Sequence, residues 1–268
     1  MTRIIRRAAV AAIFAASALA QQLDVSLVDP PVLESRLAAG AVSYGQRQAR
    51  IEELFHDAGC QVEEERVGKH SGNVICTLPG ESESVIAVGG HFDFAEAGKG
   101  IVDDWSGASL LASLYQALKT RPRRHTFVFI AFADEEKGLV GSSRHVRNMT
   151  PEQKALTHAF VNLECLGLGP VNVWLHRAAP PLAARLGEIA TTLHIPLQAV
   201  NVERVGDDDS HPFLSAHIPV ITIHSITQAT WPILHTARDQ INAIHFDDYY
   251  DAYKLAAYYL AYLDLKIE

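Results

Sequence analysis

Continuous apolar runs and helically spaced apolar positions alternate along the chain from about residue 30 to its end. Six stretches have the character of strands, at 61–67, 73–78, 84–88, 126–133, 159–163 and 220–223. The last four are almost entirely apolar, which is typical of strands that are buried on both faces of a sheet.

Between these runs, apolar residues recur at the spacing of one helix face. Helices are predicted for 30–59, ending at Gly59, and for 106–119, 180–194 and 246–265. Strands that alternate with helices indicate a largely parallel sheet. We therefore expect an α/β fold in which residues 21–268 form a single domain, with a central mixed, mostly parallel β-sheet covered by helices on both faces.

The first twenty residues differ from the rest of the chain. Three arginines precede an uncharged, alanine-rich run from Ala8 to Ala20, which has the length of a signal-peptide core and is shorter than the roughly 20 residues of a membrane span. The run ends in the cleavage pattern Ala-Leu-Ala. We expect a signal peptide at residues 1–20, cleaved after Ala20, and a secreted or periplasmic protein without a membrane span in its mature form. An uncleaved anchor is the alternative.

Charge, composition and cysteine content argue against some classes of protein. The chain has 31 acidic against 23 basic residues and a formal net charge of −8, so it lacks the basic surface of a nucleic-acid-binding protein. With 48% hydrophobic residues it is also far from the composition of disordered chains. Cys60 and Cys76 could pair in an oxidising compartment, whereas Cys165 lies in an apolar stretch and is expected to be a buried free thiol.

Acidic and histidine side chains follow several of the predicted strands or lie in the loops between them. In chain order they are His91, Asp93, Asp103, Asp104, Glu135, Glu136, Glu164 and His235. Ligands of open α/β sheets gather beyond the carboxyl ends of the strands, so we expect these side chains to lie close together. Clustered carboxylates repel one another, and a bound cation would remove that conflict.

This set of side chains has the composition of a metal site. Two histidines with three or more carboxylates suit zinc, with manganese or cobalt as chemical alternatives. The set is larger than one tetrahedral zinc ion needs, and it would serve two metal ions that share a bridging carboxylate. A further carboxylate, adjacent to a ligand, would act as general base toward a water molecule.

The order of these residues resembles that of the co-catalytic di-zinc aminopeptidases, whose clan also holds glutamate carboxypeptidase-like enzymes and glutaminyl cyclases. Five motifs carry the resemblance: His91-x-Asp93, Asp103-Asp104-x-Ser106-Gly107, Glu135-Glu136-x-Gly138-Leu139-x-Gly141-Ser142, Asn162-Leu163-Glu164 and His235-Thr236. Each motif alone is weak, and their common order is specific. The resemblance implies a zinc-exopeptidase (phosphorylase/hydrolase-like) fold, two Zn²⁺ ions, and hydrolysis of N-terminal residues from peptide substrates by a metal-bound hydroxide.

The resemblance also implies a role for each matched position. The metal ligands would be His91 and Glu164 on one ion, Glu136 and His235 on the other, and Asp103 as the bridge between them. Glu135 would be the general base that passes a proton to the leaving amine, and Asp93 would orient the His91 imidazole. Family members often have a cis peptide bond between the residues that match Asp103 and Asp104.

The chain departs from the family in three places. Residue 164 is Glu where many members have Asp, which is an oxygen donor of shorter reach. The family's Ser-Asp-His-x-x-Phe stretch appears only loosely, at 208–213. The tyrosine that stabilises the oxyanion in some members has no match, because residue 206 is Gly. We expect Asp207–Asp209 to form an exposed acidic turn, with a role near the substrate as the alternative.

Aromatic residues near the motifs are candidates for a substrate pocket. Phe94, Trp105 and Trp231 flank the motifs, with packing in the core as the alternative for each. Three further histidines are expected to be structural or exposed to solvent, namely His211, His217 and His224.

Three other functions compete with the aminopeptidase. A glutaminyl cyclase of the same fold would use one zinc ion and no water nucleophile, and the presence of both His91 and Glu164 favours two metals. A carboxypeptidase would need a basic pocket, for which Arg204 and Arg238 are weak candidates. A non-catalytic binding domain should have lost ligands or the base, and this chain retains them all.

Overall fold

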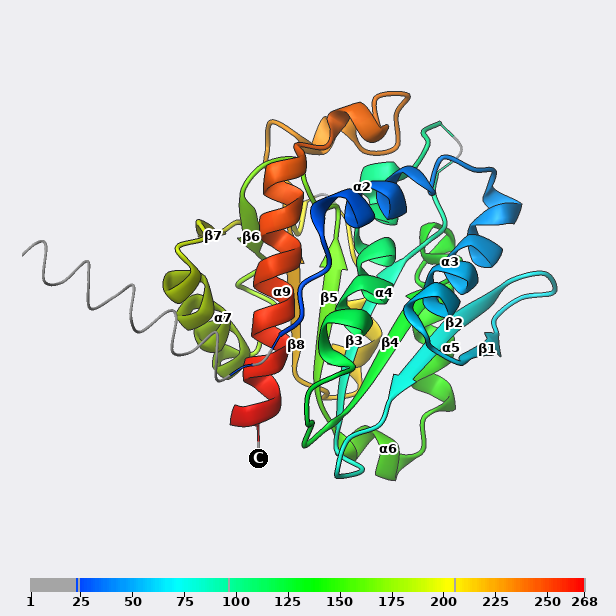
Figure 1. Ribbon diagram of the computed structural model, residues 1–268. Coiled ribbons are helices and arrows are strands. Elements are labelled where there is room, and N and C mark those ends of the chain that lie inside the picture. The colour runs from blue at the N-terminus through cyan, green and yellow to red at the C-terminus, as the bar shows by residue number, and fades with distance from the viewer. Residues whose placement is uncertain (1–22, 24, 96, 205, 268) are drawn as a thin grey trace, which may run out of the picture.

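The computed structural model describes residues 23, 25–95, 97–204 and 206–267. In this part of the chain, eight strands form one sheet in the order β1-β2-β4-β3-β5-β8-β6-β7 (Figure 1). The strands are β1 (Val62–Arg66), β2 (Gly72–Leu78), β3 (Val85–His91), β4 (Thr126–Phe132), β5 (Thr157–Glu164), β6 (Val171–Val173), β7 (Leu197–Ala199) and β8 (Val220–His224). The expected signal peptide at residues 1–20 lies outside the described residues.

The central strands β4, β3, β5 and β8 are parallel to one another. β1 and β2 add an antiparallel edge, and β6 pairs antiparallel with β8 on the other side. The prediction of a mixed, mostly parallel sheet is therefore confirmed. β6 and β7 were not expected, because three residues are too few to show a periodicity.

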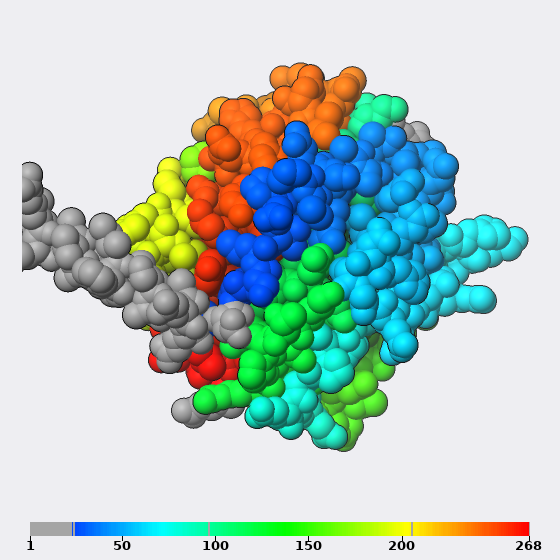
Figure 2. Space-filling view, viewed as in Figure 1, coloured from blue at the N-terminus to red at the C-terminus, as the bar shows by residue number. Residues whose placement is uncertain are grey.

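Helices cover both faces of the sheet. They are α2 (Pro30–Ala38), α3 (Tyr44–Ala58), α4 (Ser106–Leu118), α5 (Val140–Asn148), α6 (Pro151–Leu156), α7 (Pro180–Leu193), α8 (Ser210–Ser215) and α9 (Phe246–Lys266). α3, α4 and α9 lie over the face that is turned to the viewer in Figure 1. Figure 2 shows α2 and α3 (blue) beside α9 (red) on this face, with the tip of the β1–β2 hairpin (cyan) projecting at its edge.

Alternate residues of the central strands supply the two halves of the core. On β3, Ile86 and Val88 belong to the large cluster under α3, α4 and α9, whereas Ala87 belongs to the cluster with Val146 of α5 and Phe213 of α8. This two-residue alternation places α5 and α8 on the opposite face. Because both faces are buried, the strands are apolar throughout, as the sequence pattern indicated.

The segment 30–59, which was predicted to be helical, is two helices with a break at residues 39–43. At Gly40 a β-carbon would come within 2.2 Å of the Trp105 ring, so the close approach of chain and indole requires glycine. Ser43 then starts α3 with a capping box that includes Gln46. The prediction missed this break because the glycine contact joins residues far apart in the sequence.

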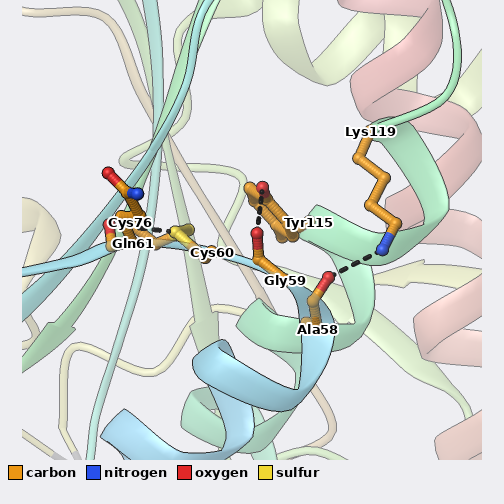
Figure 3. Close-up of a disulfide and its surroundings, with 7 residues drawn as sticks. All are labelled: Ala58, Gly59, Cys60, Gln61, Cys76, Tyr115 and Lys119. Atoms are coloured by element: carbon orange, nitrogen blue, oxygen red, sulfur yellow. Dashed lines mark hydrogen bonds between the residues drawn. A yellow bond between two sulfur atoms is a disulfide. The ribbon is translucent and has the colours of Figure 1, made fainter.

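A disulfide bond joins Cys60, just after α3, to Cys76 on β2 (Figure 3). The same end of α3 is also tied to α4, since Lys119 donates to the Ala58 carbonyl and Tyr115 to the Gly59 carbonyl. Cys165 is a buried free thiol, as expected. Within the described residues, every helix is too short or too polar to span a membrane.

Candidate metal centre

The candidate ligands meet at the carboxyl edge of the parallel strands. His91 is the last residue of β3, Glu164 is the last residue of β5, and Glu135 follows β4 on a short 3₁₀ turn. These three strands are neighbours and run parallel, so their ends lie side by side. The loop before α4 adds Asp103, and the loop after β8 adds His235.

Two groups of potential metal ligands share Asp103. His91 Nε2 lies 3.2 Å from Asp103 Oδ1 and 3.7 Å from Glu164 Oε1. His235 Nε2 lies 3.0 Å from Asp103 Oδ2 and 3.1 Å from Glu136 Oε2. In each group the ligand atoms all lie within 4.8 Å of one another. Each oxygen of Asp103 thus faces a different histidine.

The electrostatics of these groups favour a cation. Burial raises the pKa of Glu164, and the neighbouring Asp103 and Asp208 raise it further. Burial and nearby acids also hold the pKa of Glu135 well above its usual range. For His91 burial acts in the opposite direction, but the surrounding carboxylates outweigh it and raise the pKa well above its usual range. His91 and Asp103 are buried, whereas the His235 side chain is 58% exposed. Imidazole and carboxylate donors in this number suit zinc, and one or two dications would relieve the repulsion.

Asp93 connects the His91 ligand to the turn that carries the candidate base. Its Oδ1 lies 3.4 Å from His91 Nδ1. The same carboxylate accepts hydrogen bonds from the backbone N–H groups of Glu135 at 3.0 Å and Glu136 at 3.2 Å. Asp93 therefore bonds to the Glu135–Glu136 turn and lies against the His91 imidazole, which links two parts of the site.

The segment before α4 contains a cis peptide bond between Asp103 and Asp104, and the two carboxylates point to different partners. Asp104 is fully buried and accepts hydrogen bonds from the backbone N–H groups of Gly107 at 3.0 Å and Cys165 at 2.9 Å. It is thus occupied in joining the start of α4 to the end of β5. Asp103 remains directed at the two histidines.

Asp239 is a further residue of this region that received no role in the sequence analysis. It is buried, and it accepts hydrogen bonds from Val102 N at 2.7 Å and Asp103 N at 3.4 Å. Burial raises the pKa of Asp239 to about 6, although these two hydrogen bonds act to lower it. Its position four residues after His235 was the only sequence signal, and the bonds run to main-chain groups that a sequence does not reveal.

A pocket of about 210 Å³ opens onto both ligand groups. Its lining combines acidic side chains with the apolar residues Cys165, Trp174, Val202, Ile226, Trp231 and Leu234. Of the three aromatic candidates only Trp231 lines this pocket, and its side chain is 45% exposed. Trp105 is fully buried and donates to the Arg36 carbonyl, and Phe94 packs against Tyr44.

The expectation of an exposed turn at 207–209 is wrong for two of its three residues. Asp208 and Asp209 are buried. Asp208 accepts hydrogen bonds from Ser210 N at 3.0 Å and from Thr222 Oγ1 at 2.7 Å, and burial raises the pKa of Asp209 to about 8. Asp207 alone is partly exposed. The run of three acids looked solvated because the sequence did not show that α8 packs here.

Comparisons with known proteins agree with this architecture. The chain is 28% identical to Leupeptin-inactivating enzyme 1 of Streptomyces exfoliatus over 152 residues, which are 55% of this chain and 34% of that protein. It is 31% identical to the probable leucine aminopeptidase 2 of Aspergillus fumigatus over 143 residues, which are 53% of this chain and 26% of that protein. The chain spans about a third or less of the length of these curated relatives.

Solved structures share the fold at low sequence identity. The zinc aminopeptidase BSAP of Bacillus subtilis has a TM-score of 0.65 at 24% identity, covering 71% of this chain and 49% of that one. The glutaminyl cyclase of an Acidobacteriales bacterium has a TM-score of 0.72 at 16% identity, covering 90% of this chain and 97% of that one. The model of Peptidase family M28 matches residues 73–260, which is well over half of the sequence. The chain therefore belongs to Peptidase family M28.

Proposed function

We propose that this protein is a zinc-dependent aminopeptidase that holds two Zn²⁺ ions and removes N-terminal residues from peptides. The observation that carries the proposal is the shared position of Asp103, whose two oxygens face His91 and His235 at 3.2 and 3.0 Å. A carboxylate placed between two ligand groups is the arrangement that a two-metal site needs. Similarity to named aminopeptidases supports this assignment.

Each side chain has a part in the proposed mechanism. His91 and Glu164 would hold one ion, Glu136 and His235 the other, and Asp103 both. When bound, the two ions would polarise the scissile carbonyl and make a water molecule acidic enough to react near neutral pH. Glu135 would accept that water's proton and deliver it to the leaving amine.

The charge of the pocket favours a free amino terminus over a free carboxyl terminus. The residues described as lining it include six acids and no lysine or arginine. The two arginines considered for a carboxypeptidase do not line it, and Arg238 bonds to the Pro232 carbonyl. Two bound Zn²⁺ ions would offset four of these six negative charges and leave the pocket acidic. It would then attract a substrate ammonium group and repel a terminal carboxylate, so the aminopeptidase is favoured over the carboxypeptidase.

A glutaminyl cyclase is the second candidate, because the fold covers nearly the whole of a solved cyclase chain. It would act on an N-terminal glutaminyl residue in the same acidic pocket. The presence of both ligand groups favours hydrolysis. A non-catalytic binding role is the least favoured, since the candidate base and all candidate ligands are present together.

We further propose that the chain acts outside the cytoplasm after removal of residues 1–20. The disulfide between Cys60 and Cys76 supports this, since such bonds persist in oxidising compartments. Mass spectrometry of the protein purified from its native host would test it. A mature N-terminus at Gln21 is expected, and an intact Met1 start would contradict the proposal.

The activity is tested with a panel of chromogenic aminoacyl substrates, free or blocked at the N-terminus, together with a glutaminyl peptide. We expect cleavage of free N-termini only, loss of activity with a chelator, and recovery with Zn²⁺. Glu135→Gln should keep its zinc content and lose a factor of about 10² to 10⁴ in turnover, whereas the exposed Glu152→Gln should match the wild type. Pyroglutamate formation without cleavage would establish the cyclase instead.

A further inference from the structure

The first turn of α3 contacts two of the loops that carry candidate ligands. Tyr44 and Arg47 are three residues apart, so they lie on the same side of the helix. Tyr44 reaches the loop after β4, and Arg47 reaches the segment that joins His91 to Asp103. Both residues precede the region matched by the family model, residues 73–260.

Arg47 joins the two ends of that segment. It is fully buried, and its Nη1 donates to the Phe92 and Gly100 carbonyls, each at 3.1 Å. Its Nη2 donates to Gly100 at 3.1 Å and also to the Lys99 carbonyl. Phe92 follows His91 directly, and Gly100 lies three residues before Asp103. The two Nη groups of the Arg47 guanidinium therefore hold the chain beside two candidate ligands and contact neither ligand side chain.

Cation–π contacts with two aromatic rings help to hold the guanidinium in place. Its central carbon lies 4.6 Å from the Phe94 ring centroid and 4.9 Å from the Trp105 ring centroid. The Nη1 and Nη2 groups thus donate to carbonyls, the Nε–H has no hydrogen-bond partner among the described residues, and two aromatic rings lie beside the planar group. An ammonium group cannot reproduce this arrangement. Burial lowers the pKa of Arg47 to about 10, so it remains a cation at neutral pH, facing Asp239, Asp93 and Asp104.

Tyr44 holds the second loop. Its hydroxyl donates to Asp134 Oδ1 and accepts from Lys137 Nζ at 2.9 Å. Asp134 directly precedes Glu135 and has a left-handed backbone conformation, which is uncommon for a residue other than glycine. Hydrogen bonds to its side chain help to hold the turn in this conformation. Ser71 and Lys137 also bond to Asp134, at 2.6 and 2.7 Å.

The opposite end of α3 is fixed to the rest of the fold. The disulfide of Cys60 ties it to β2, and the Lys119 bond to the Ala58 carbonyl, 2.8 Å long, ties it to α4 (Figure 3). A helix that is anchored at one end and bonded to two loops at the other can hold those loops at a set distance.

We propose that α3 is a brace for the metal centre, in which Arg47 and Tyr44 are positioning residues that set the separation between the His91–Asp103 segment and the Glu135–Glu136 turn. The inference rests on the proposed metal site. It assigns a function to a helix outside the matched family region, and it predicts that metal binding depends on side chains that contact no metal.

The test measures Zn²⁺ affinity by competition with a coloured chelator, and the visible absorption spectrum of the Co²⁺-loaded protein. Arg47→Lys keeps the charge and loses the fork, so we expect Zn²⁺ affinity to fall by about 10- to 100-fold, the range for groups that orient ligands. The Co²⁺ spectrum should change, because it reports ligand geometry. Tyr44→Phe should also weaken binding, and the double variant should bind more weakly than either single one.

Two control variants separate positioning from stability. Arg50→Lys alters an exposed arginine one turn further along α3, paired with Glu53. Arg121→Lys alters a buried arginine paired with Asp264 at 3.0 Å, beyond the far end of α4, whose 13 residues span about 20 Å. Arg121→Lys should lower the melting temperature. Both control variants should leave the Zn²⁺ affinity and the Co²⁺ spectrum unchanged.

The outcomes distinguish this inference from the proposed function. If the wild-type protein binds no Zn²⁺, the metal site itself fails. If the wild type binds Zn²⁺ and folded Arg47→Lys binds it within a factor of two, with the same Co²⁺ spectrum, the brace is refuted. An equal loss of affinity in Arg121→Lys would also refute it, because the effect would then follow stability alone.

Discussion

His224, the last residue of β8, is buried as a neutral imidazole whose titration should lower the stability of the protein in mild acid. The side chain is fully buried, its Nε2–H donates to the Val200 carbonyl at 3.0 Å, and its Nδ1 accepts from Ile226 N at 3.0 Å. A second proton on Nδ1 would break the latter bond and place a charge in the core. Burial accordingly lowers the pKa of His224 from 6.5 to about 4.

The size and sign of the effect follow from this difference. Below pH 6.5 the unfolded chain takes up a proton at His224 that the folded chain refuses until about pH 4. The contribution of His224 to the free energy of unfolding should therefore fall as the pH drops through this window and stay constant above it. Each tenfold difference in proton affinity corresponds to about 1.4 kcal/mol, which gives a loss of about 2 kcal/mol at pH 5 and about 3 kcal/mol at pH 4.

The assay is urea unfolding at pH 7.5 and pH 5, with a chelator present so that metal binding does not contribute. His224→Gln can keep a donor and an acceptor and cannot take up a proton. Its loss of stability between the two pH values should be about 2 kcal/mol smaller than that of the wild type, whatever its stability at pH 7.5. The exposed His56→Gln should behave like the wild type. Equal losses in His224→Gln and the wild type would refute the reasoning.

Three further variants test separate parts of the structure. Burial would raise the pKa of Glu65, but hydrogen bonds from His145, Asn148 and Asn73 outweigh it and lower it to about 2; Glu65→Gln should therefore lose less stability than the wild type in urea unfolding as the pH falls from 4.5 toward 2. Replacing both Cys60 and Cys76 by serine should cost about 3 kcal/mol for a loop of 16 residues, seen as a melting temperature lower by about 6–12 °C. Asp239→Asn keeps only one acceptor oxygen for Val102 N and Asp103 N, so chelator competition should show Zn²⁺ affinity weaker by about tenfold.

The sequence predicted those elements whose pattern is long enough to read. β3, β4, β5 and β8 stand out because burial on both faces makes them continuously apolar. The strands β6 and β7 left no signal, because their positions are decided by pairing with neighbours rather than by local periodicity. The break between α2 and α3 was equally hidden, since it depends on the Trp105 ring against Gly40.

The candidate site was predictable to the extent that its groups are side chains at strand ends. His91 and Glu164 had to meet once β3 and β5 were adjacent and parallel, and the structure brings Asp103, Glu136 and His235 to them. Their roles as ligands, and that of Glu135 as base, stay predictions. The buried state of Asp208 and Asp209 was missed because nothing local distinguishes an acid under a helix from one in water.

The supports of the site could not be read from the sequence, because they act through the main chain. The segment that leads to Asp103 is held by opposite charges: Arg47 binds its carbonyl groups, and the Asp239 carboxylate binds its N–H groups. The opposite assignment would not work, since a carboxylate cannot donate to a carbonyl and a guanidinium cannot accept from an N–H. Both side chains bond to main-chain groups of the segment, and the carboxylate of Asp103 faces the two histidines. The geometry of such a centre therefore depends as much on the side chains that bond to the main chain of the loop, here Arg47 and Asp239, as on the ligands themselves.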